Sequence, residues 1–118
     1  MAAPPEFPIG ELIPRPERTA AALKAALAVV APERLPEMLA EQTEAITPAV
    51  ESDSLDPLRG FLLRWAAVVE IERDPQTASR LRRAEYLMHA ATDPAESRGH
   101  ALAVSEIIRG AYRACSST

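Results

Sequence analysis

Residues 58–73 read LRGFLLRWAAVVEIER, and this stretch predicts the helix around which the rest of the chain is organised. It holds the single tryptophan, Trp65, and the densest apolar run of the sequence. Asp56 and Pro57 precede the run and are typical of an N-cap and a first helical residue. Six apolar side chains recur at helical spacing and form one stripe, the predicted core: Leu58, Phe61, Leu62, Trp65, Val68 and Val69.

The length and composition indicate one globular domain. A chain of 118 residues with 47% hydrophobic and 25% charged residues can bury a core without disulfides or metals. Aromatic residues make up only 4%, so aliphatic side chains must fill that core. One cysteine, Cys115, excludes an intrachain disulfide, and it lies in an end that we expect to fray without a role. With no secretory leader pattern and no run of about 18 apolar residues, we expect a cytoplasmic protein with no membrane contact.

Proline and periodicity divide the chain. Residues 1–16 hold five of the 11 prolines and predict a Pro-rich flexible tail, followed by a single helical domain over 17–118. Helical stripes predict five helices. The first covers residues 17–30, the second begins at Pro32 or Pro36 and ends at 46, and the last three cover 57–73, 75–91 and 94–113. Residues 47–56 are expected to be a linker, because Pro48 should end the second helix, and Val50 and Leu55 should hold this linker to the core. The fold class is therefore all-α, a compact bundle of about five helices.

Three Asp-Pro pairs mark the second half of the chain, at 56–57, 74–75 and 93–94. Each pair offers a capping carboxylate followed by a residue whose φ is already helical. We therefore expect three consecutive helices with very short connections.

Charge is distributed unevenly. Residues 1–56 carry 4 basic and 10 acidic side chains, a net charge of −6, whereas residues 57–118 carry 9 basic and 7 acidic ones, a net charge of +2. The acidic face of the second predicted helix, with Glu37, Glu41 and Glu44, favours a cationic neighbour, although a solvated face explains it as well. The arginines at 80, 82 and 83 could pair with that face, within the fold or across a dimer. The overall charge of −4 argues against general nucleic-acid binding.

The chemical inventory favours a protein that is not an enzyme. Glu85/His89 and Glu96/His100 have helical i, i+4 spacing, but no third ligand, paired cysteine or HExxH motif accompanies them. The four glycines form no phosphate-binding loop, and no nucleophile elbow is present. We expect no catalytic residue, no cofactor site and no metal site.

The candidate interaction surface combines a basic patch with surplus apolar residues on the last two helices. It comprises Arg80, Arg82, Arg83, Leu87 and Ile107. These features favour a helical protein-interaction or regulatory module with a protein partner or a homodimer. Two alternatives stay open: a DNA-associated transcriptional regulator using residues 80–83, and a small helical enzyme or metal-binding protein using the glutamate–histidine pairs.

Two stretches carry a family resemblance: TAAALKAALAVVAPERLPEMLAE at 19–41 and LDPLRGFLLRWAAVVEIERDP at 55–75. Over residues 17–83 the chain resembles an uncharacterised family of small actinobacterial all-helical proteins, some of them adjacent to toxin-like genes. The resemblance implies an antitoxin-like or adaptor role and transfers no catalytic residue. The chain departs from the family pattern at Ala66, where a second tryptophan is expected, and in its longer C-terminal helix.

Overall fold

The computed structural model describes residues 10–116, and this part of the chain is helical without a strand. It contains α1 (Ala20–Val30), a short 3₁₀ helix η1 (Pro32–Arg34), α2 (Leu35–Ser52), α3 (Asp56–Glu72), α4 (Pro75–Ala90) and α5 (Pro94–Ser116). The prediction of an all-α fold with five packed helices is confirmed.

Side-chain caps explain where three helices begin. The Thr19 hydroxyl accepts a hydrogen bond from the Ala22 amide at 3.2 Å, so α1 begins three residues after the predicted Glu17. Asp74 and Asp93 accept bonds from the amides of Gln76 and Ala95, as the Asp-Pro pattern predicts.

The first Asp-Pro pair differs from the other two. Asp56 is the first residue of α3 rather than its cap, and its own amide donates to the Ser54 hydroxyl at 3.1 Å. The Asp56 carboxylate instead contacts Arg59, 3.3 Å away. Leu55 is the N-cap of α3 and makes no side-chain capping bond, so the sequence pattern does not hold at this pair.

Helix α2 is longer than predicted. It continues through Pro48 to Ser52, and the connection to α3 is only 53–55. A proline inside a helix removes one backbone hydrogen bond. The helix ends at Asp53, whose left-handed φ of 51° lets its amide and that of Ser54 bond back to the last turn. The predicted linker over 47–56 is therefore wrong.

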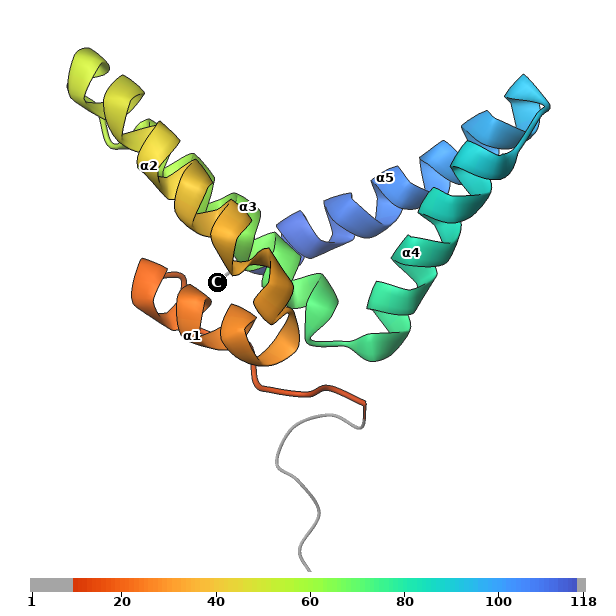
Figure 1. Cartoon of the computed structure of the whole chain (residues 1–118), viewed down its shortest axis with the longest axis horizontal. Coiled ribbons are helices and arrows are strands. Elements are labelled where there is room, and N and C mark those ends of the chain that lie inside the picture. Colours follow the sequence, from red (N-terminus) through yellow and green to blue (C-terminus); the bar gives the residue numbers. More distant parts are fainter. Residues whose placement is uncertain (1–9, 117–118) are drawn as a thin grey trace, which may run out of the picture.

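The helices form two antiparallel pairs that diverge from a common base (Figure 1). One pair, the α2–α3 arm, combines α2 with the first part of α3, and the other, the α4–α5 arm, combines α4 and α5. The end of α3, the end of α5 and helix α1 meet at the base. Within the described chain, α2 contacts neither α4 nor α5. Short connections explain this layout, because each helix must turn back directly on the one before it.

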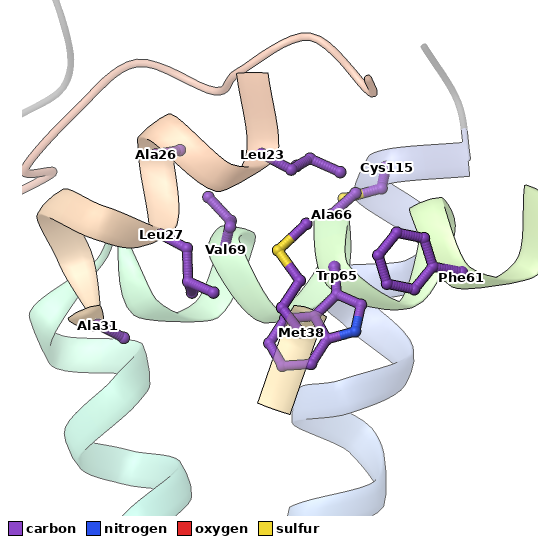
Figure 2. Packing of buried hydrophobic residues seen from close by; sticks show 10 residues of the cluster. All are labelled: Leu23, Ala26, Leu27, Ala31, Met38, Phe61, Trp65, Ala66, Val69 and Cys115. Carbon is purple, nitrogen blue, oxygen red and sulfur yellow. The ribbon is translucent and has the colours of Figure 1, made fainter. Parts of the chain in front are cut away.

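The large buried side chains gather at the base (Figure 2). Trp65 and Val69 of α3 are fully buried with Leu23 and Leu27 of α1 and Met38 of α2, in agreement with the predicted stripe. Of the other predicted core residues, Phe61 is 7% exposed, and Leu58, Leu62 and Val68 are half-buried because the opposite side of α3 faces outward.

Cys115 belongs to the same cluster. It is 4% exposed and packs near Ala66, so the prediction of a fraying end without a role is wrong at this position. Burial raises the pKa of its thiol. Cys115 is close to the end of the sequence but buried in the fold, because the last part of α5 packs against α3.

A second and smaller cluster joins the α4–α5 arm to α3. Its buried members are Ala67, Ile71, Ala78 and Ala111, with Leu81, Ile107 and Tyr112 packed alongside. Alanine lets helices approach closely but buries little apolar area, so each contact here stabilises the fold less than those around Trp65.

Candidate functional site

A groove of about 860 Å³ lies between α4 and α5, and we call it the α4–α5 groove. Figure 1 shows the two helices close together at the turn that joins them and farther apart toward α3. Its floor is apolar, because Ile71, Ala84 and Ala111 are buried there and Leu87 and Ile107 are half-buried.

Four exposed arginines line this groove: Arg80 and Arg83 on α4, and Arg109 and Arg113 on α5. None of them takes part in an ion pair among residues 10–116. Two groove carboxylates lie on α4, α5 or their caps. Asp74 accepts hydrogen bonds as the N-cap of α4, so Glu106 is the only one of these two whose carboxylate is not engaged in capping. The groove therefore presents an uncompensated positive charge around an apolar floor.

The base of the groove is closed by an ion-pair network. Arg73, 6% exposed, donates to Glu70 at 2.8 Å and to Glu11 at 2.6 Å, and Arg15 makes a two-pronged contact with Glu70 at 2.8 and 2.9 Å. The hydrogen bonds from Arg15, together with those from Arg73, lower the pKa of Glu70 to about 2. A buried arginine paired on both sides is a fixed structural element rather than a free cation.

The same network docks the start of the described chain. The Leu12 amide donates to the Arg73 carbonyl at 2.8 Å, and Arg73 Nη1 donates to the Ile13 carbonyl at 3.2 Å. Residues 11–15 were predicted to belong to a flexible tail, and the structure holds them against the end of α3 instead. The first nine residues of that tail lie outside the described part of the chain.

Four of the five residues of the predicted interaction surface line the groove: Arg80, Arg83, Leu87 and Ile107. Arg82 lies outside the groove, and its Nη1 atom is 3.7 Å from Glu72 Oε2. Sequence reasoning missed Arg109 and Arg113, although both lie on the helix of Ile107. Arg109 and Arg113 are four residues apart, so they share one face of α5, and this spacing could have suggested a cationic border.

The predicted pairing between these arginines and the acidic face of α2 does not form within one copy. Arg64 of α3 pairs with that face instead, 2.8 Å from Glu41 and 3.5 Å from Glu37, and Arg34 lies 3.1 Å from Glu37. The arms diverge, so α2 and α4 do not touch. Arg64 also covers the Trp65 ring, with its guanidinium carbon 5.5 Å from the ring centre.

The glutamate–histidine pairs do not assemble into a ligand set. No group of three or more His, Cys, Asp or Glu side chains within residues 10–116 could hold a metal ion. His100 lies beside the groove and is half-buried, whereas His89 is exposed on α4.

The α2–α3 arm carries exposed apolar side chains. Leu39, Ile46 and Val50 are 47%, 49% and 73% exposed, and Leu55 at the tip is 59% exposed. Val50 and Leu55 therefore do not hold the segment to the core, which corrects the prediction for them. Together with Leu58, three of these residues border a shallow hollow of about 400 Å³.

No known family model, curated protein or solved structure matches this chain. No helix in the described range, 10–116, is long and apolar enough to cross a membrane.

Proposed function

We propose that this chain is a non-enzymatic interaction module that binds an acidic helical segment of a protein partner in the α4–α5 groove. The observation that supports the proposal is the set of four unpaired arginines around an apolar floor. An amphipathic helix binds a groove by its apolar face, and carboxylates on its flanks would meet the arginines. The proposal includes a cytoplasmic location, and an antitoxin-like or adaptor role is one specific form of it.

Arginine suits this task better than lysine would. Its planar guanidinium contacts a carboxylate through two parallel hydrogen bonds and loses hydration at lower cost. Twelve of the 13 basic residues of the chain are arginine. Because the four groove arginines are exposed and have no carboxylate partner among residues 10–116, binding need not break an ion pair of the described chain.

A DNA-associated regulator is the second candidate, since the same arginines could contact phosphates. Unpaired Glu106 reduces the attraction for a polyanion, and among residues 10–116 no tyrosine, tryptophan or phenylalanine lines the groove to stack on bases. The protein-partner proposal is therefore better supported than the nucleic-acid one.

The test is affinity capture from the source organism at moderate salt, with mass spectrometry of the eluted proteins. We expect a stoichiometric protein partner that is lost with the Arg80→Glu/Arg83→Glu variant and retained with Arg98→Glu, an exposed arginine outside the groove. Identical captured proteins for wild type and the groove variant would contradict the proposal. Recovery of DNA in place of protein, confirmed by a mobility shift at low salt, would favour the second candidate.

A further inference from the structure

Helix α2 has the chemistry that the α4–α5 groove requires of a ligand. Its 18 residues include four glutamates and no basic residue. Glu37 and Glu41 contact Arg64, whereas Glu44 and Glu51 are exposed and make no ion pair within residues 10–116. The helix thus presents unpaired carboxylates to solvent.

The same helix has an exposed apolar stripe beside its carboxylates. Leu39, Ile46 and Val50 are seven and four residues apart, so they share one face of α2. Three large aliphatic side chains, each about half exposed or more, lie on one face of a helix that already buries Met38 and Ala49 on another. A second packing face on one helix indicates a binding surface.

The two surfaces cannot meet in one copy. The α2–α3 and α4–α5 arms diverge, and α2 contacts neither α4 nor α5. Their lengths are compatible, because α2 would be about 27 Å long, against about 24 Å for α4 and about 34 Å for α5. Contact between acidic α2 and the cationic groove therefore requires a second molecule.

We propose that α2 of one copy docks in the α4–α5 groove of a second copy, and that the two copies exchange this contact reciprocally in a two-fold dimer. The inference rests on the groove being the binding surface proposed above. The exposed arginines of the groove face the unpaired carboxylates Glu44 and Glu51, and the apolar stripe covers the groove floor. Packing α2 against α2 is disfavoured, because each of these helices carries four carboxylates.

Charge reversal on each side tests the dimer with the full chain. Light scattering coupled to gel filtration gives the mass of the wild type, of Arg80→Glu/Arg83→Glu and of Glu44→Arg/Glu51→Arg. We expect a wild-type dimer that weakens as salt rises, and a dissociation constant raised at least about 100-fold in either variant. Arg98→Glu is the matched control and should remain dimeric. Circular dichroism shows whether each variant keeps its helices.

Mixing the two reversed variants provides the decisive measurement. In a heterodimer, the acidic groove of Arg80→Glu/Arg83→Glu meets the basic α2 of Glu44→Arg/Glu51→Arg. The second contact joins the unchanged groove of one variant to the unchanged α2 of the other, so both contacts pair opposite charges. We expect the mixture to form a heterodimer although each variant alone is monomeric. A monomeric wild type, or a dimer that neither reversal weakens, would overturn the inference.

The outcome also separates this inference from the proposed function. If the wild type is monomeric but its captured partner depends on Arg80 and Arg83, self-pairing is wrong and the groove still binds another protein. If reversal of these arginines changes neither the mass nor the captured proteins, both proposals fail. A mass that grows beyond two copies with concentration would show an open head-to-tail contact and would overturn the closed dimer.

Discussion

The two arms of this protein share a design, an antiparallel helix pair, but differ in what stabilises them and in what they leave exposed. The α2–α3 arm has its acidic face partly neutralised by Arg64 and joins the core through Met38 and Trp65. The α4–α5 arm meets α3 in a smaller cluster whose buried members include Ala78 and Ala111, and its groove arginines form no ion pair within residues 10–116. The comparison shows that large apolar side chains hold the first arm to the base, whereas small side chains and unpaired surface charge characterise the second within residues 10–116.

The largest expected effect is at the base. Trp65→Ala removes a fully buried ring and the surface on which Arg34 and Arg64 lie, 5.2 and 5.5 Å from its centre. We expect the free energy of unfolding to fall by about 3–5 kcal/mol, measured by urea denaturation. Val50→Ala, at a position 73% exposed, should change it by less than about 0.5 kcal/mol. Equal effects at the two positions would show that the large side chains at the base do not dominate the stability.

The ion-pair network should give the next largest effect. Glu70→Gln weakens the contacts to Arg15 and Arg73, and we expect a loss of about 2 kcal/mol at neutral pH. Glu72→Gln is the matched control, since Glu72 makes a longer contact, 3.7 Å, with exposed Arg82.

The pH dependence follows from the lowered pKa of Glu70. With a pKa of about 2 in the fold against an ordinary 4.5, ionised Glu70 stabilises the wild type above pH 4.5. That stabilisation is lost as the pH falls from 4.5 toward 2, and the loss should be smaller in Glu70→Gln. Parallel stability curves for wild type and variant over this range would contradict the assignment.

The alanine contacts of the α4–α5 arm can be overfilled. Ala78 is 3% exposed, and Ala78→Leu should separate α4 from α3 and cost about 1–3 kcal/mol. Ser79→Leu, one residue away on the exposed side of α4, should cost much less. Hydrogen exchange should then show faster opening of α4 than of α1 in Ala78→Leu. Equal acceleration in both helices would mean that the arm does not open separately from the base.

The smallest effect compares one glycine from each arm. An added methyl group at Gly60 of α3 or Gly99 of α5 would meet no atom within 4 Å, so alanine at either site should stabilise its helix by about 0.5–1 kcal/mol. Gly60→Ala should raise the global stability, whereas Gly99→Ala should mainly slow hydrogen exchange in the α4–α5 arm. If both variants raise the urea midpoint by the same amount and neither slows hydrogen exchange selectively in one arm, the two arms unfold as one unit.

Features of this fold that depend on neighbouring residues could be predicted from the sequence, whereas features that depend on distant residues could not. The stripe through Trp65 and Val69 and the Asp74–Pro75 start were predicted because each depends on residues within a few positions of one another. Pro48 does not end α2 as predicted, because tertiary packing of α2 on α3 outweighs one missing backbone bond. The burial of Cys115 was not predicted either, since nothing near the end of the sequence indicates that α5 packs against α3.

The groove was only half predictable. Arg80, Arg83, Leu87 and Ile107 were chosen from local clustering, but Arg109 and Arg113 joined them through the pairing of two helices. The pairing of these arginines with the acidic face of α2 within one copy was wrong for the same reason, because which helix lies beside which is a long-range property.

The sequence by itself determined that the chain is helical, where most of its helices begin and which faces are apolar, because periodicity, caps and proline act over a few residues. Only the tertiary structure decided that the helix pairs diverge, that Arg64 pairs with Glu37 and Glu41, and that four arginines line one groove without an ion partner in the described part of the chain. Those features depend on how α3 and α5 cross at the base. Many apolar contacts set that crossing together, and no local stretch of sequence specifies it.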